Sequence, residues 1–181
     1  PSSAADAKGL LKMACRMNDP VLFMEHKGLY RQGYAATEEP DNEYVLPFGK
    51  GRIVSPGEDL TIITWGAMVQ KSVEAVQSLG LDNGQVEIID LRTLNPIDMK
   101  LIESSIQKTS KVLVVHEDNF TNGPGAEISA LVADKYFELL DGPVRRVAAK
   151  DSPVPFNWLL EEKVLPQTED VVIAIEELLE Y

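Results

Sequence analysis

Apolar and polar residues alternate in blocks along this chain, and short apolar runs are followed by stretches with helical spacing. From residue 48 onward the largely apolar runs are Leu60–Thr64, Val86–Leu91, Lys111–Val115 and Val144–Ala148. Continuous apolar runs of this length are typical of strands that are covered on both faces of a parallel sheet. The pattern therefore predicts four strands in this part of the chain.

Helical spacing follows each of these strands. The apolar positions that share one helical face are Val69, Val73, Val76 and Leu79, then Ile97, Leu101, Ile102 and Ile106, then Ile128, Leu131, Val132, Tyr136 and Leu139, and finally Val171, Ile175, Leu178 and Leu179. Gly80 is expected to end the first helix, Asn95-Pro96 to start the second and Thr168 to cap the last. Repeated strand–helix units predict an α/β fold with three α/β/α layers and a mostly parallel sheet.

The residues before position 48 follow a different pattern. Asp6–Met17 has helical spacing with Asp6 as its expected cap, and Val21–Met24 reads as a short strand buried on both faces. Gly33–Pro47 has no periodicity and is expected to be an extended linker lying on another element. Near the other end, Pro153–Pro166 is rich in aromatic residues and proline, and we expect it to be irregular.

Composition narrows the class of protein. The chain has 181 residues and a net charge of -12, and such an acidic surface repels nucleic acid and anionic lipid. There is no apolar stretch of about 18 residues and no signal peptide, so no membrane partner is expected. Cys15 is the only cysteine, which excludes an intrachain disulfide and suits a reducing compartment; its apolar surroundings predict a small buried thiol. Because the chain begins at Pro1 rather than Met, we interpret it as a piece of a longer protein.

Polar residues follow the predicted strands at the edge where ligands of parallel sheets bind. They are Trp65-Gly66, Arg92-Thr93, His116-Glu117 and Lys150-Asp151. His116-Glu117-Asp118 is a candidate metal or acid–base cluster, or alternatively part of an interface or a capped loop. A metal site needs about three or four convergent ligands, and the other histidine, His26, is distant in sequence.

Two further motifs remain open on the residues alone. His26 follows the predicted strand Val21–Met24, and it is either at the rim of a pocket or an ordinary loop histidine. The turn Gly123-Pro124-Gly125 opens a helix, whose amino end is a potential anion site. However, Glu127 already supplies negative charge there, so a purely structural turn is the favoured interpretation.

Seven tracts occur in the order and spacing of a known family. They are PSSAADAKGLL, DPVLFMEHKGLYR, Gly49-Lys50, EDLTIITWGAMV, VEIIDLRTLNPID, SIQKTSKVLVVHED and GPGAEISALV. With these tracts the chain resembles the carboxyl-terminal part of the beta subunit of thiamine diphosphate-dependent 2-oxoacid dehydrogenases (the E1 component), and more broadly transketolase carboxyl-terminal domains. The pair His116-Glu117 is similar to the branched-chain members, whereas these usually have proline at the position of His26.

The resemblance implies a division into parts. Residues 1–31 would be the tail of a pyrimidine-binding domain, 32–47 a linker, and 48–181 a complete transketolase carboxyl-terminal domain. The parent enzyme would decarboxylate a 2-oxoacid with thiamine diphosphate and Mg²⁺ and pass the acyl group to lipoyl-E2. The family's catalytic and cofactor-binding residues would lie upstream and on the alpha half, so this fragment alone is expected to be inactive and to bind no thiamine diphosphate. His26 would lie at the pocket mouth.

The same resemblance implies a potassium site and a set of protein partners. Main-chain carbonyl groups of Ala14, Cys15, Met17 and Asp19 match the family's potassium ligands. The partners would be the alpha half, a second beta half in a two-fold dimer or heterotetramer, and the E2 subunit-binding domain, for which the acidic terminus is the expected docking surface: Glu176, Glu177, Glu180 and Tyr181. The expected compartment is the bacterial cytoplasm or the mitochondrial matrix. The alternative function is a non-catalytic protein-binding module that uses the same fold.

Overall fold

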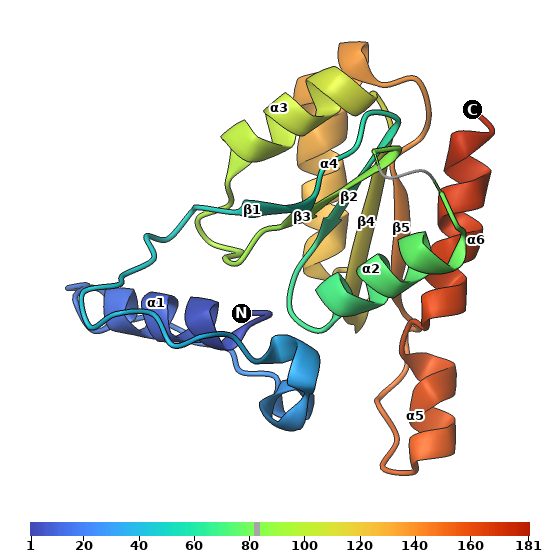
Figure 1. Cartoon of the computed structure of the whole chain (residues 1–181). Helices are drawn as coiled ribbons and strands as arrows, with labels where there is room; N and C mark the ends of the chain where they lie inside the picture. The colour runs from blue at the N-terminus through green and yellow to red at the C-terminus, as the bar shows by residue number, and fades with distance from the viewer. Residues whose placement is uncertain (82–83) are drawn as a thin grey trace.

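A five-stranded mixed sheet organises the chain (Figure 1) in the computed structural model, which describes residues 1–81 and 84–181. The strand order is β1-β3-β2-β4-β5. The strands are β1 (Arg52–Ser55), β2 (Leu60–Thr64), β3 (Val86–Asp90), β4 (Val112–Asn119) and β5 (Arg145–Ala149). Neighbouring strands are parallel except β1, which pairs antiparallel with β3.

Helices cover both faces of this sheet. Their bounds are α1 (Ala4–Ala14), α2 (Met68–Ser78), α3 (Met99–Thr109), α4 (Pro124–Tyr136), α5 (Trp158–Val164) and α6 (Thr168–Leu179), with short 3₁₀ helices η1 (Lys27–Arg31), η2 (Gly33–Ala35) and η3 (Phe137–Leu139). α2 and α6 pack on one face, and α3 and α4 pack on the other. This arrangement confirms the predicted three-layer α/β/α fold with a mostly parallel sheet.

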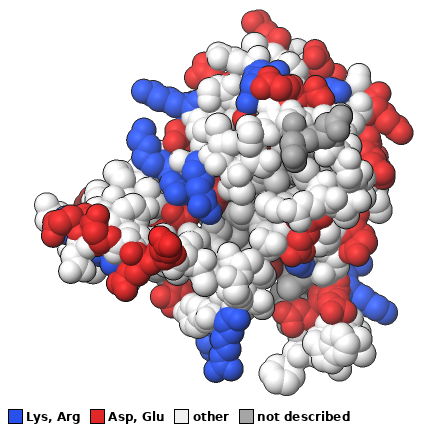
Figure 2. Space-filling view, in the orientation of Figure 1, with Lys and Arg blue, Asp and Glu red and all other residues white. Residues whose placement is uncertain are grey.

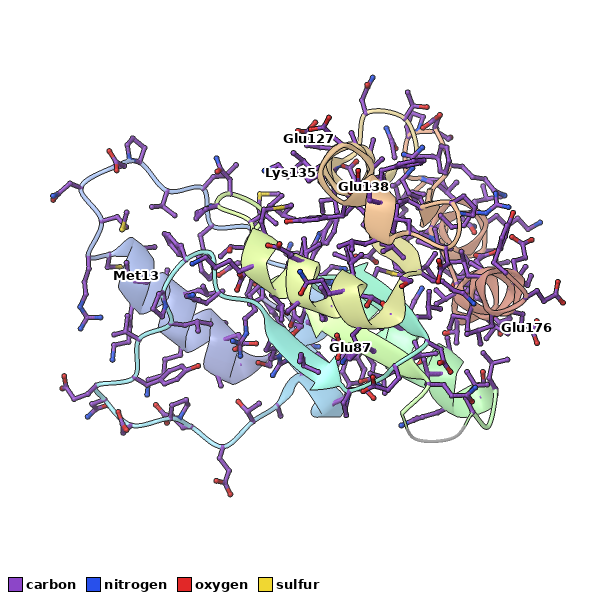
Figure 3. The ribbon with its side chains drawn as sticks, turned by 90° about the horizontal axis from the view of Figure 1, so that it is seen from above. Met13, Glu87, Glu127, Lys135, Glu138 and Glu176 are labelled. Carbon is purple, nitrogen blue, oxygen red and sulfur yellow. The ribbon has the colours of Figure 1, made fainter. Side chains whose placement is uncertain are left out.

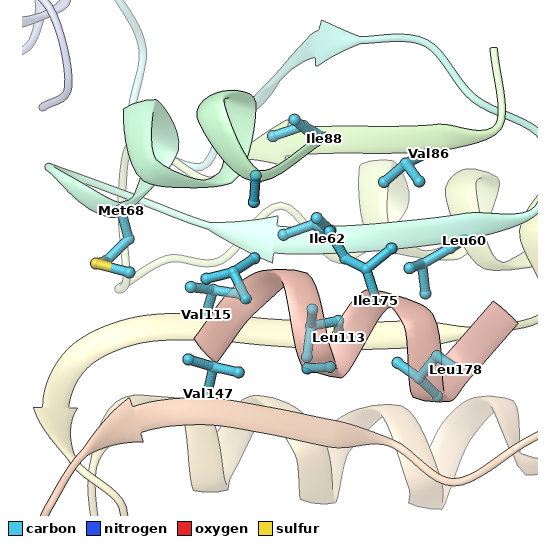
Figure 4. Close-up of a cluster of buried hydrophobic side chains, with 13 residues drawn as sticks. Leu60, Ile62, Met68, Val86, Ile88, Leu113, Val115, Val147, Ile175 and Leu178 are labelled. Atoms are coloured by element: carbon cyan, nitrogen blue, oxygen red, sulfur yellow. The ribbon is translucent and has the colours of Figure 1, made fainter. Parts of the chain in front are cut away.

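The core is divided by the sheet because successive strand residues point to opposite faces. Ile62, Ile88 and Leu113 face α2 and α6, where Figure 4 shows them against Ile175 and Leu178. The residues that alternate with them face α3 and α4: Ile63, Ile89, Val112 and Val114. All of these side chains are buried, and the predicted inner faces of the helices supply the other half of each core.

Several predicted boundaries were wrong, each because a different side chain makes the cap. Ser3 rather than Asp6 caps α1 and accepts a hydrogen bond from the Asp6 N–H, while Asp6 is buried. Asp98 caps α3, and Asn95-Pro96 forms a cis peptide before the helix begins. Gln167 caps α6 in a capping box with Asp170, so Thr168 is the first helical residue. The positive φ predicted for Gly80 is confirmed.

Two further elements differ from the sequence pattern. β1 was not predicted, since its residues are only partly buried at the edge of the sheet. Within the predicted irregular segment Pro153–Pro166, α5 forms because the Asn157 side chain accepts a hydrogen bond from the Leu159 N–H. Much of this helix projects its apolar side chains into solvent, which explains why its pattern does not indicate a packed face.

The amino-terminal part contains the largest difference. Val21–Met24 is extended but forms no strand, and Leu22 and Met24 are 87% and 70% exposed. The prediction of a strand buried on both faces was wrong for this chain, because in its described residues no neighbouring strand pairs with the run. Cys15 is exposed rather than buried, since it follows the last residue of α1.

The predicted linker does lie on another element, namely α1. The Leu46 N–H donates to the Gly9 carbonyl oxygen, and the Ala5 N–H donates to Thr37 Oγ1. Gly9 is required at this crossing, because a Cβ atom there would lie 2.6 Å from the Tyr44 ring. The linker thus runs back along α1 before it enters the sheet at β1.

Candidate functional site at the carboxyl edge of the sheet

The carboxyl edge of the sheet is built around β4, which extends beyond the predicted strand end at Val115. It continues through Asn119, with a register shift against β5. His116 and Glu117 therefore lie within a strand rather than in a loop. Because consecutive strand residues point to opposite sides, the two side chains enter different surroundings.

His116 lies in the interior. It is 0% exposed, its ring stacks on Trp65 with centroids 5.4 Å apart, and neither ring nitrogen has a hydrogen-bond partner among the described residues. Burial lowers the pKa of this histidine, with Asp118 raising it and Arg146 lowering it further. The imidazole is therefore neutral at physiological pH and serves as a packed ring beside the turn Gly123-Pro124-Gly125.

Glu117 pairs with the other histidine of the chain. His26 Nε2 lies 3.0 Å from Glu117 Oε2. The hydrogen bond and the charge of Glu117 raise the pKa of His26, although partial burial opposes this. Sequence reasoning treated the two histidines as unrelated because 90 positions separate His26 from His116. The signal available in the sequence was that both stand at predicted strand ends.

Arg92 belongs to a buried charged cluster at the same end of β3. Arg92 Nη2 lies 2.8 Å from Asp6 Oδ1, and Arg52 Nη2 lies 3.5 Å from Asp6 Oδ2. Asp90 accepts hydrogen bonds from the Ser2 hydroxyl, from Arg52 and from the Arg92 N–H. The cluster joins α1 to β1 and β3. Asp6 and Asp90 were not identified as members of a site from the sequence.

The remaining predicted edge residues are separated from these groups. Asp151 accepts hydrogen bonds from the Thr121 N–H and hydroxyl, and these bonds lower the pKa of its carboxyl group. Lys150 is exposed. In residues 1–81 and 84–181, no three His, Cys, Asp or Glu side chains converge to hold a metal ion. The residues predicted as the His116-Glu117-Asp118 cluster therefore do not form one site. His116 packs against Trp65, whereas Glu117 pairs with His26.

The neutral buried His116 predicts acid sensitivity. Its folded pKa is below the ordinary value of 6.5, so the unfolded chain binds the proton more readily and stability falls as pH drops through 6.5. We expect the free energy of unfolding of the native chain, minus that of a His116→Leu variant, to fall as the pH drops from 8 to 5. Thermal unfolding followed by circular dichroism measures it, and a value that rises on acidification would contradict the assignment.

This comparison isolates His116 from His26. The raised pKa of His26 has the opposite sign, because it contributes stability below 6.5 that is lost as pH rises through the folded pKa. His26 is present in both chains of the comparison, so its contribution cancels to the extent that the two sites are independent.

Comparison with known families shows to which protein family this chain belongs. A profile described as "Transketolase, C-terminal domain" matches residues 49–171. The chain belongs to the transketolase carboxyl-terminal domain family. The resemblance inferred from the seven tracts is therefore confirmed at the level of this family, and the match includes all five described strands of the sheet, from β1 to β5.

Relatives in this family extend the similarity to the entire chain. The pyruvate dehydrogenase E1 component subunit beta of Staphylococcus aureus is 41% identical over 181 residues, which is 100% of this chain and 55% of that protein. The mitochondrial subunit beta-1 of Arabidopsis thaliana is 42% identical over 175 residues, covering 96% of this chain and 48% of that protein. The chain thus spans about half the length of these relatives. It is similar to these E1 beta subunits, which agrees with the expected resemblance to their carboxyl-terminal part.

A solved structure supports the fold independently. A split gene transketolase, described as an inactive beta4 tetramer, superposes with a TM-score of 0.77 at 24% identity, over 99% of this chain and 56% of that one. At this identity the likeness shows the transketolase carboxyl-terminal fold. None of the described helices is long and apolar enough to span a membrane.

Proposed function

We propose that this chain is the carboxyl-terminal portion of the E1 beta subunit of a 2-oxoacid dehydrogenase complex. The observation that carries the proposal is 41% identity to a pyruvate dehydrogenase beta subunit across all 181 residues. In this role the chain supports oxidative decarboxylation of a 2-oxoacid and acyl transfer to lipoyl-E2 through assembly and docking. Its relatives favour pyruvate, while the branched-chain substrate suggested by His116-Glu117 remains a prediction.

The proposed division is a pyrimidine-domain tail in residues 1–31, a linker in 32–47 and a complete carboxyl-terminal domain in 48–181. The start of the family match at residue 49 supports the last boundary. The unpaired run Val21–Met24 supports the first, because an extended apolar segment without neighbours suits a strand whose partners belong to another part of a longer protein.

Thiamine diphosphate with Mg²⁺ is the proposed cofactor of the parent enzyme, where it supplies the chemistry of decarboxylation. We assign no catalytic or cofactor-binding residue to this chain, and its described residues contain no cluster of metal-ligating side chains. For potassium, the proposed ligands are the carbonyl groups of Ala14, the last residue of α1, and of Cys15, Met17 and Asp19, which follow it. Neutral carbonyl oxygens suit this ion, and the last carbonyls of a helix lack helical partners. The Ala14 oxygen also accepts from the Met17 N–H.

A chimera tests the proposed function directly. The chain is joined at Pro1 to the preceding residues of the S. aureus relative and produced with the matching alpha subunit. We expect thiamine-dependent decarboxylation of pyruvate by the chimera and none by the chain alone. Titration calorimetry of thiamine diphosphate with Mg²⁺ into the chain alone is expected to give no binding heat, and tight Mg²⁺-dependent binding would overturn the proposed division of labour.

The proposed partners are the alpha half, a second beta half and the E2 subunit-binding domain, in the bacterial cytoplasm or the mitochondrial matrix. Glu176, Glu177, Glu180 and Tyr181 form the proposed E2-docking surface. All four are exposed, Glu176 projects outward from α6 in Figure 3, and Figure 2 shows acidic side chains along the side where α6 lies. Carboxylates at a helix carboxyl end repel its dipole, so a basic partner would be attracted there.

This surface predicts salt-sensitive binding to a basic E2 segment. Changing Glu176, Glu177 and Glu180 to glutamine is expected to weaken binding roughly tenfold at low salt, chiefly through slower association, because exposed charges steer encounter. Surface plasmon resonance at several salt concentrations measures this. The matched control neutralises Glu127, Asp134 and Glu138 on the opposite helical layer and should change little. Equal effects of both triple variants would argue against the surface.

The alternative function, a non-catalytic binding module with the same fold, makes a different prediction for the chimera. Such a module would fold and bind protein partners, yet the chimera would stay inactive with every substrate. Assembly with the alpha subunit without activity would therefore favour the alternative.

A further inference from the structure

Residues 18–36, which follow α1 and include the first residues of the linker, contact the carboxyl edge of the sheet through His26 and Glu117; we call this segment the strap. Its own hydrogen bonds are local: the Leu29 N–H donates to the His26 carbonyl oxygen, and the Gln32 N–H donates to that of Leu29. These bonds belong to η1, and the bond from the Ala36 N–H to the Gly33 carbonyl oxygen belongs to η2; none of them joins the strap to the sheet. Among the described residues, the ion pair that joins the strap to the sheet is His26–Glu117.

The two members of this pair come from elements of different rigidity. Glu117 lies on β4, whose preceding residues are buried and paired on both sides, and His116 beside it is locked between Trp65 and the start of α4. His26 precedes η1 in a stretch whose side chains are mostly exposed. Glu117 is therefore the fixed member, and His26 is the member that it positions.

Few other charged groups face His26. The amino group of Pro1 opposes its positive charge, and Glu117 favours it. On η2, the Tyr34 phenol senses Glu74 and Glu117, and burial with these charges raises its pKa, so it stays neutral. Asp118, the next residue of β4, acts on His116 instead. Glu117 is thus the group that determines the charge of His26.

We propose that Glu117 is a positioning residue, which holds the protonated imidazole of His26, and with it the strap, against the carboxyl edge of the sheet. The effect of this positioning on catalysis rests on the proposed function, together with the expectation from the family resemblance that His26 lies at the pocket mouth of the parent enzyme. The ion pair exists only while His26 is protonated and Glu117 is ionised. The strap is therefore held by the ion pair at pH values below the raised pKa of His26, and as pH rises through it only the weaker hydrogen bond of a neutral imidazole can remain.

Nuclear magnetic resonance on the chain tests the pair. The pH midpoint of the His26 Cε1 resonance is compared in the native chain and in Glu117→Gln, Glu117→Asp and Asp118→Asn variants. We expect Glu117→Gln to lower the midpoint towards the ordinary 6.5, Glu117→Asp to restore part of it, and Asp118→Asn to shift His116 but not His26. An unchanged His26 midpoint in Glu117→Gln would overturn the proposal.

A second readout separates positioning from a local charge effect. Amide hydrogen exchange at Leu29, Gln32 and Ala35 reports on the strap, and exchange at Thr61 reports on the sheet. We expect Glu117→Gln to speed exchange several-fold in the strap at pH 6 and to leave Thr61 unchanged. Equal exchange in the strap of both proteins would show that the pair positions nothing and would overturn the proposal even if the midpoint moves.

Kinetics in the active chimera distinguish this proposal from the proposed function. If His26 lies at the pocket mouth, Glu117→Gln shifts the alkaline limb of the kcat/KM profile to lower pH, and Glu117→Asp partly restores it. If the resonance and exchange results hold but the profile does not move, the positioning role stands and the assignment of His26 to the pocket mouth falls.

Discussion

Replacing Arg92 with alanine is expected to lower the free energy of unfolding by about 3–5 kcal/mol, because it leaves the buried Asp6 carboxylate without its closest partner. The Asp6 side chain is 2% exposed, and the Arg92 side chain is 14% exposed. Arg52 remains near Asp6, but at 3.5 Å and from a more exposed position. Urea unfolding followed by circular dichroism measures the loss.

One control variant tests the cause of this loss. Arg145→Ala removes an exposed arginine that is not part of the cluster, and we expect a change within about 0.5 kcal/mol. Arg92 has a positive φ of 60°. This backbone conformation is unfavourable for alanine as well as for arginine, so relief of backbone strain cannot mask the effect. If Arg92→Ala and Arg145→Ala destabilise the chain equally, the buried cluster does not contribute as we infer.

Replacing Gly125 with alanine is expected to cost about 1–3 kcal/mol by overpacking. The new Cβ atom would overlap Nε2 and Cδ2 of His116, and the imidazole cannot retreat because it is buried and stacked on Trp65. Alanine is favoured over glycine in helices by up to about 1 kcal/mol, which is smaller than the expected overlap penalty. Thermal and urea unfolding measure the net effect.

The rescue of this variant identifies the contact. In the double variant Gly125→Ala with His116→Ala the colliding ring is absent, so the two changes should be clearly non-additive. Gly142→Ala is the matched control, because its Cβ would meet only Tyr181 atoms at ordinary distances of 3.4–3.7 Å. Additive costs for Gly125→Ala and His116→Ala would contradict the close packing of His116 at this turn.

The layered fold was predictable because strands such as Leu60–Thr64 are largely apolar and the helices between them have one apolar face. Caps were less predictable, since Asp98 and Asn95 are both good capping residues and only the path of the chain decides between them. The exposed Val21–Met24 run was mispredicted for a different reason. Its composition indicates a buried strand, but burial depends on neighbours that residues 1–81 and 84–181 do not provide.

The sequence indicated where in the fold the candidate site lies, but it did not indicate which residues contact one another there. Parallel strand ends at Arg92, His116 and Glu117 correctly indicated one edge of the sheet. The partners of these residues come from the amino-terminal part, where Asp6 looks like a helix cap and His26 like a loop residue. Contacts between segments so distant in sequence have no local pattern, so composition and periodicity do not reveal them.

The buried cluster around Asp90 also has a consequence for how the chain folds. The hydrogen bond between Ser2 and Asp90 spans 88 positions and joins the residues before α1 to the end of β3. Closing so long a loop costs conformational entropy before any contact compensates for it. We therefore expect the first helix to dock after the sheet has formed, and to be among the first parts to detach when the native chain opens locally.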